Sequence, residues 1–208
     1  MSNVLFVKAN NRPSEQSVSV QMYETFFNSY KEAHPDDQIT ELNLFEAELP
    51  YYDVDMMTGL YKQSNGYEPT AQEKQAADLA NRYLEQFLAA DKVVFAFPLW
   101  NFTIPAQLLT YLFYITQSGK TFSYSAEGPV GLAGDKKVVL LNARGGIYSE
   151  GPAASIEMSL NYLKTMMGFI GIKQPEVVVI EGHNQFRDRA QEIVEAGLKK
   201  TAQVAASF

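Results

Sequence analysis

Short runs of hydrophobic residues recur along the chain, and their spacing predicts a parallel β-sheet. Four runs of β-branched, aliphatic and aromatic residues occupy positions 4–7, 93–97, 138–141 and 177–180. Uninterrupted runs of this kind are typical of strands that are buried on both faces of a parallel sheet. A fifth segment, 38–44, alternates polar and apolar residues, which predicts a half-exposed strand at the sheet edge.

Helical periodicity fills the intervals between these strands. Apolar residues three and four positions apart predict helices over about 17–30, 70–88, 105–119, 152–170 and 187–206. Thr70 and Glu73 have the spacing of a capping box, which marks the start of the second helix. The alternation predicts an α/β fold with a doubly wound, five-stranded parallel sheet of order 2-1-3-4-5 and helices on both faces. We expect residues 1–208 to form one domain.

Two segments fall outside this alternation. Residues 45–69 carry four tyrosines and are too long for an ordinary connection, so we interpret them as a functional loop. A lid over a pocket and a contact between subunits are equally consistent with this composition. Residues 121–134 contain glycines, serines and Pro129, which predicts a hairpin or an arm.

Composition and charge exclude several classes of function. The chain has 17 basic and 24 acidic residues, and its net charge of -7 argues against a groove for nucleic-acid phosphates. Without cysteine, there are no thiolate nucleophiles, disulfides or cysteine-bound metal clusters. No stretch reaches the roughly 18 apolar residues of a membrane span, and the N-terminus lacks a basic leader. We therefore expect a cytoplasmic protein without nucleic-acid or membrane partners.

The unusual residues gather in the loops where a ligand is expected. In a doubly wound sheet, ligands bind beyond the carboxyl ends of the strands, where the strand order reverses. The loops that follow the first, third and fourth predicted strands are 9–16, 98–105 and 143–151. The first leads into a helix through Ser17 and Ser19, and hydroxyls at a helix N-terminus suit a phosphate. A simple N-cap role explains either serine equally well when it is taken alone.

The other two loops suit a flat aromatic ligand. Trp100 and Phe102 lie in a segment bounded by two prolines, so a rigid backbone offers a stacking surface, although isolated aromatic residues more often pack in the core. Gly145 and Gly146 allow close approach to a ligand or a positive φ, and an ordinary turn is an equal alternative. Neither a dinucleotide-binding glycine motif nor a P-loop is present.

At these residues the chain resembles the bacterial FMN-dependent NADH-azoreductases, which are flavodoxin-like quinone and azo reductases. The resemblance covers nearly the whole length. It rests on the segments VKAN at 7–10, SVS at 17–19, PLWNF at 98–102, TFSY at 121–124, EGP at 127–129, RGG at 144–146 and GFIG at 168–171.

The resemblance implies an FMN cofactor, NADH or NADPH as hydride donor, and azo dyes and quinones as acceptors. It also implies a homodimer with the flavin at the subunit interface. The expected cofactor-binding residues are Asn10, Ser17, Val18 and Ser19 for the phosphate, Pro98, Leu99, Trp100, Asn101 and Phe102 for the ring, and Ala143, Arg144, Gly145 and Gly146 for its pyrimidine edge. The expected substrate-binding residues are Tyr124, Tyr148, Phe169 and His183.

In the mechanism that this resemblance implies, the flavin receives the hydride and then passes it to the acceptor. No side-chain acid or base is required, so we expect no catalytic side chain and no metal. His183 follows the last predicted strand and either donates to a substrate or has a structural role. His34, near the end of the first helix, is expected to be structural.

A flavodoxin-type FMN electron carrier without its own substrate is the alternative function. The arm 121–134 and the tyrosine-rich segment favour the enzyme, because both offer cover for a substrate. A receiver-type signalling module of similar topology is excluded, since the loops after the first and third strands lack the acidic residues that it needs.

Overall fold

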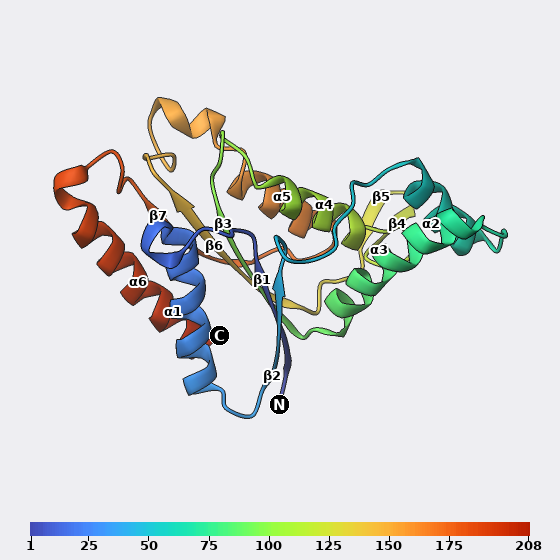
Figure 1. Cartoon of the computed structure of the whole chain (residues 1–208), viewed down its shortest axis with the longest axis horizontal. Helices are drawn as coiled ribbons and strands as arrows, with labels where there is room; N and C mark the ends of the chain where they lie inside the picture. The colour runs from blue at the N-terminus through green and yellow to red at the C-terminus, as the bar shows by residue number, and fades with distance from the viewer.

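The computed structural model describes residues 1–208, and a five-stranded parallel sheet runs through its centre (Figure 1). The strand order is β2-β1-β3-β6-β7, which confirms the predicted order 2-1-3-4-5. Every neighbouring pair is parallel. The strands are β1 (Asn3–Lys8), β2 (Gln38–Asn43), β3 (Lys92–Pro98), β6 (Lys137–Arg144) and β7 (Glu176–Glu181). All five predicted strands are therefore present, and their carboxyl ends share one edge of the sheet.

Helices cover both faces of this sheet (Figure 1). They are α1 (Val18–Ala33), α2 (Val54–Asn65), α3 (Ala71–Ala89), α4 (Ala106–Ile115), α5 (Leu160–Phe169) and α6 (Ala190–Ser207). Three single-turn 3₁₀ segments precede α1, α5 and α6, at Ser14–Gln16, Pro152–Ile156 and Arg187–Arg189. None of the helices is both long enough and apolar enough to cross a membrane.

The two faces of the sheet carry cores of different size. Leu5 and Val7 of β1 point into a core of 28 buried residues that is closed by α3, α4 and α5. Val4 and Phe6 point the other way, into a core of 15 buried residues closed by α1 and α6. Side chains of successive strand residues alternate between faces, so every central strand contributes to both cores. The continuous hydrophobic runs of the sequence follow from this two-sided burial.

The capping box and the hairpin are confirmed. Thr70 Oγ1 accepts from Glu73 N at 3.2 Å, and Thr70 N donates to the Glu73 carboxylate at 2.7 Å, so α3 begins where the sequence predicts. Residues 121–134 contain the antiparallel pair β4 (Phe122–Ser125) and β5 (Gly128–Gly131). A Cβ on Gly131 would lie 2.1 Å from Gly171 N, so the hairpin backbone packs directly on the end of α5.

The interpretation of residues 45–69 as a loop was wrong for the middle of the segment, because α2 lies there. The Asp53 side chain accepts from Met56 N at the start of this helix, and Gly66 ends it with a φ of 75°. Gly59 packs against the backbone of α3, where a Cβ would lie 2.1 Å from Glu73 O. Apolar residues on the exposed side of α2, such as Tyr61, obscure the helical period in the sequence.

The continuous helix predicted over 152–170 is also interrupted. Residues Pro152–Ile156 form a 3₁₀ turn, and α5 begins only at Leu160. The buried Glu157 carboxylate explains the break, because it accepts from the backbone N–H groups of Ser159, Leu160 and Asn161 at 2.8–3.1 Å. These bonds satisfy the first turn of α5 from outside the helix.

Candidate functional site

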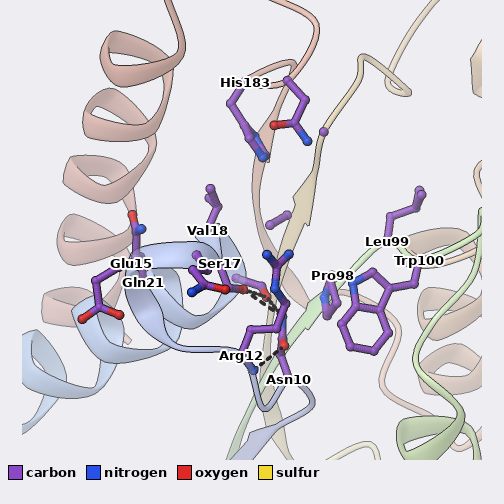
Figure 2. Close-up of a pocket in the computed structure, with 15 residues that line it drawn as sticks. Asn10, Arg12, Glu15, Ser17, Val18, Gln21, Pro98, Leu99, Trp100 and His183 are labelled. Atoms are coloured by element: carbon purple, nitrogen blue, oxygen red, sulfur yellow. Dashed lines mark hydrogen bonds between the residues drawn. The ribbon is translucent and has the colours of Figure 1, made fainter. Parts of the chain in front are cut away.

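A cleft of about 470 Å³ lies at the carboxyl edge of the sheet, where the strand order reverses between β1 and β3. Figure 2 shows the loop after β1 and the first turn of α1 on one side, with Pro98 and Trp100 facing them. The lining residues are Asn10, Arg12, Glu15, Gln16, Ser17, Val18, Ser19, Gln21, Pro98, Leu99, Trp100, Ala143, Gly145, His183 and Asn184. The structure thus brings the three predicted loops together in one cleft.

Three buried polar side chains form a cluster at one end of the cleft. Asn10 Nδ2 donates to Ser17 Oγ at 2.8 Å and to Ser19 Oγ at 2.9 Å, and the two hydroxyl oxygens lie 3.2 Å apart. Asn10 Oδ1 accepts from Arg12 N at 3.0 Å. The asparagine therefore links the loop after β1 to the first turn of α1.

The N-terminus of α1 keeps free donors in the cleft. Ser17 is the N-cap residue, but its hydroxyl makes no capping bond to the helix backbone. Its carbonyl accepts from Val20 N and Gln21 N, whereas the N–H groups of Val18 and Ser19 donate to no acceptor in the chain. Unpaired N–H groups at a helix N-terminus attract anions. The simple N-cap interpretation of Ser17 therefore does not account for its hydroxyl.

A tight turn follows β3 and carries backbone strain. Trp100 N donates to Thr103 O, and Thr103 N donates to Trp100 O, at 2.9 and 3.0 Å. Asn101 and Phe102 between them have φ values of 47° and 70°, so the segment has the backbone of a type I′ turn. Such turns favour glycine, and a phenylalanine at positive φ is unusual and strained. Neither Asn101 nor Phe102 is among the residues that line the cleft of this chain.

The carboxyl end of β6 reaches the cleft through Ala143, and the loop after β6 reaches it through Gly145. Neither Gly145 nor Gly146 has a positive φ, so a positive φ is not the reason for glycine at these positions. At Gly145, a Cβ would lie 2.5 Å from the Asn184 side chain, and Gly145 O accepts from Asn184 N at 2.9 Å. The loops after β6 and β7 are thus packed into one wall, with Gly146 outside the cleft lining.

The Arg144 side chain points away from the cleft and into a buried charge cluster. Its Nε donates to Asn142 Oδ1 at 2.6 Å, and its Nη atoms lie 3.3 Å from Glu181 and 3.9 Å from Glu157. Burial by itself raises the pKa of Glu157, but hydrogen bonds from the Ser159 hydroxyl and from the first turn of α5, together with the charge of Arg144, hold that pKa below its usual range. The guanidinium is only 3% exposed, so it is occupied by the protein's own carboxylates.

His183 lines the cleft with one ring nitrogen unsatisfied (Figure 2). Its Nδ1 is buried and has no hydrogen-bond partner. Burial lowers the pKa of His183 below its ordinary value, so the imidazole is neutral at pH 7. A neutral imidazole offers one donor and one acceptor without adding charge to the cleft.

The remaining predicted substrate residues lie outside this cleft. Tyr124 is 73% exposed on the β4–β5 hairpin, where its ring contacts Phe122 at 5.5 Å between centroids. Phe122 in turn contacts Phe169 at 4.6 Å, so Tyr124 and Phe169 belong to one aromatic group on the hairpin and α5. Tyr148 lies elsewhere, 6.4 Å from Phe102 between ring centroids.

Several cleft residues were missed by the sequence analysis, namely Arg12, Glu15, Gln16, Gln21 and Asn184. Arg12 is the most informative of them, because it is exposed and has no carboxylate within ion-pair distance. Figure 2 shows it between the first turn of α1 and Pro98. The position of Arg12 in the loop after β1 could have indicated its role, but only hydroxyl groups were considered there as phosphate ligands.

The residues fit a phosphorylated planar ring. One end of the cleft presents two unpaired N–H groups, two hydroxyls and a free guanidinium, which are all hydrogen-bond donors. The other end presents Pro98, Leu99 and Trp100 opposite the glycine-containing loop after β6. Apolar and aromatic walls with a few fixed polar groups are typical of cofactor sites.

Comparison with known sequences identifies close relatives over the full length. A family model described as "Flavodoxin-like fold" matches residues 2–205. The chain is 61% identical to FMN-dependent NADH:quinone oxidoreductase 1 of Listeria monocytogenes serovar 1/2a over 208 residues, which is 100% of each chain. It is also 61% identical to FMN-dependent NADH:quinone oxidoreductase 3 of Bacillus thuringiensis subsp. konkukian, again over 100% of each chain.

Solved structures give the same result. An azoreductase from Bacillus anthracis strain Sterne superimposes with a TM-score of 0.98 at 60% identity, covering 100% of both chains. An FMN-dependent NADH-azoreductase from Bacillus anthracis strain Ames Ancestor, solved in complex with FMN, superimposes with a TM-score of 0.89 at 28% identity. It covers 100% of this chain and 99% of its own.

Proposed function

The chain belongs to the family with the flavodoxin-like fold, and from this we propose that it is an FMN-dependent oxidoreductase that transfers hydride from NADH to quinones and azo compounds. The observation that carries the proposal is the single cleft in which the loops after β1, β3 and β6 meet, with donors at one end and a flat wall at the other. Overall, NADH, a quinone and one proton give NAD⁺ and the quinol.

The donor end of the cleft is suited to the FMN phosphate. We assign the phosphate to the N–H groups of Val18 and Ser19 and to the hydroxyls of Ser17 and Ser19, with Arg12 supplying positive charge. The partial positive charge at the N-terminus of α1 adds to this attraction. Because Arg12 has no carboxylate partner, no ion pair has to break when an anion enters.

The flat wall is suited to the flavin ring. FMN, when bound, accepts hydride from the nicotinamide and passes it to the acceptor. Pro98, Leu99 and Trp100 give the ring a rigid surface, and Gly145 of the loop after β6 lines the same cleft. The neutral His183 places one further polar contact in the same cleft. We propose that these residues bind and orient the ring.

We further propose that the enzyme is a homodimer in which a second copy completes the substrate site. Tyr124 and Phe169 are absent from the cleft of their own chain, yet Tyr124 is 73% exposed and packs on Phe122, which in turn contacts the half-buried Phe169. Beside the strained turn, Met158 is 53% exposed and Phe102 is 43% exposed. Large exposed apolar side chains on both segments are what a subunit interface uses. Tyr148 and Arg144 do not line the cleft, and we propose that they support the loop after β6 instead of contacting the flavin ring.

One assay tests the proposed activity directly. The purified protein, loaded with FMN, is expected to lose its flavin absorbance when NADH is added anaerobically and to regain it when a quinone or an azo dye follows. Light scattering on the same sample is expected to give the mass of a dimer. Protein that cannot be loaded with FMN contradicts the proposal, and flavin that is reduced but not reoxidised by either acceptor favours a flavodoxin-type electron carrier.

The remaining expectations from composition stay proposals. We propose that residues 1–208 act as one flavodoxin-like unit in the cytoplasm, without nucleic-acid or membrane partners. The net charge of -7 supports the proposed absence of nucleic-acid partners, since nucleic acids bind basic surfaces.

A further inference from the structure

We propose that Asn10 is a positioning residue that fixes the hydroxyls of Ser17 and Ser19 as hydrogen-bond donors, so that this end of the cleft selects a phosphate over a hydroxyl. The inference rests on the proposed function, because it concerns the phosphate of FMN. It assigns Asn10 an indirect role: the amide acts on the two serines, and the serines act on the ligand.

The orientation of the Asn10 amide is determined by its neighbours. Its Oδ1 lies 3.0 Å from Arg12 N, and a backbone N–H can only donate, so this atom must be the carbonyl oxygen. The NH₂ group therefore faces the serines, at 2.8 Å from Ser17 Oγ and 2.9 Å from Ser19 Oγ. Every polar atom of the Asn10 side chain is thus used within the chain.

This arrangement determines where the serine protons point. Each hydroxyl oxygen already accepts an N–H from Asn10, so its own proton must turn away from the amide. One proton has a local alternative, because Ser17 Oγ and Ser19 Oγ lie 3.2 Å apart. Only one of the two protons is used in that contact, so at least one hydroxyl donates outward in every arrangement.

Together with the free N–H groups of Val18 and Ser19, the outward hydroxyl makes this end of the cleft a cluster of donors. Asn10 and Ser19 are each 2% exposed and Ser17 is 8% exposed, so bulk water has little access to reorient the cluster. An ionised phosphate accepts from all of these donors. A hydroxyl in the same place carries no charge, so it forgoes the charge-assisted hydrogen bonds that the phosphate makes with these donors.

The test compares FMN with riboflavin, which ends in a hydroxyl where FMN has its phosphate. Trp100 is the only tryptophan and lines the cleft, so its fluorescence reports binding of either flavin to the full-length chain. The variants are Asn10→Ala, the double variant Ser17→Ala with Ser19→Ala, and the triple combination. Asn43→Ala is the matched control, because Asn43 Oδ1 also accepts from a backbone N–H two residues later, at 3.2 Å from Phe45 N.

We expect Asn10→Ala to raise the Kd for FMN about tenfold and to change the Kd for riboflavin less than twofold. The serine double variant should have the same selective effect, and the triple variant should bind FMN no more weakly than the double variant does. Non-additivity of this kind identifies residues that act through one another. Asn43→Ala should leave both Kd values unchanged.

Four results overturn the inference. If Asn10→Ala raises the Kd for FMN by the same factor in the wild-type chain and in the serine double variant, Asn10 acts on the ligand directly. If Asn10→Ala raises the Kd values for FMN and riboflavin by the same factor, the role of Asn10 is only structural. Wild-type protein that binds both flavins equally well refutes the donor cluster alone, whereas wild-type protein that binds neither refutes the proposed function as well.

Discussion

Replacing Arg144 with methionine should be among the most destabilising single changes in this chain. The guanidinium is 3% exposed and lies between Glu157 and Glu181, which are themselves 3% and 16% exposed at their side chains. Methionine keeps most of the length and the packing surface but removes the charge and the donors. The variant therefore leaves two acidic groups close together in a site with little water.

The magnitude follows from the contacts that are lost. Removing one partner of a buried ion pair costs about 3–5 kcal/mol, because the remaining charge is left uncompensated. Glu157 keeps its hydrogen bonds to Ser159 and the first turn of α5, which favours the lower end of that range. We expect a loss of about 3 kcal/mol in the free energy of unfolding at pH 7.

Urea unfolding measures this loss. A chain of this size has a slope of about 3 kcal/mol per molar urea, so the midpoint should fall by about 1 M. The matched control is Arg82→Met, since Arg82 and its partner Glu48 are exposed and 3.8 Å apart. Such a surface pair contributes less than about 1 kcal/mol.

The pH dependence gives a second check with a defined sign. Arg144 helps to lower the pKa of Glu157 in the folded protein, so its stabilising effect is present above the unfolded pKa of a glutamate and is lost as the pH falls. The gap between wild type and Arg144→Met should therefore narrow below about pH 4. A loss under about 1 kcal/mol at pH 7, no larger than that of Arg82→Met, would refute the reasoning.

Three further predictions concern single positions. Tyr111→Phe should raise the melting temperature, because the Tyr111 hydroxyl is fully buried without a partner and its removal gains about 1 kcal/mol; an unchanged or lower value contradicts this. Phe102→Gly should be about 1 kcal/mol more stable to urea unfolding than Phe102→Ala, because φ is 70° at this position and glycine adopts that backbone without strain. A Phe102→Ala variant that is the more stable of the two would show that the backbone is not strained there. Asp37→Asn should destabilise the protein at pH 7. Hydrogen bonding, chiefly from Tyr30, lowers the pKa of Asp37 to about 2, so the difference in urea midpoint should shrink as the pH falls from 4 toward 2, and a constant difference excludes this cause.

The sheet and most helices follow from local sequence patterns. The two-sided burial of β1, β3 and β6 produces unbroken hydrophobic runs, and the bonds between Thr70 and Glu73 mark the start of α3. The location of the cleft also follows, because strand order alone determines where the carboxyl ends diverge. These features depend on residues that are close in sequence or on topology.

The remainder depends on contacts between distant residues. Nothing local indicates that Arg144 turns inward, because its partners Glu157 and Glu181 are 13 and 37 positions away along the chain. The positive φ of Phe102 is equally hidden, since the turn it occupies normally has glycine there. The helix α2 escaped prediction because several of its outward residues, such as Met57 and Tyr61, are apolar.

The unequal cores on the two faces of the sheet have a consequence for the lifetime of the protein. The α1 and α6 layer is held by the smaller core, so its separation from the sheet breaks fewer buried contacts than separation of the opposite layer does. The N-terminus of α1 is also the proposed anchor for FMN, and a ligand that binds only the closed form opposes that opening. Resistance to proteases should therefore depend on the supply of cofactor, so that chains without FMN are degraded first.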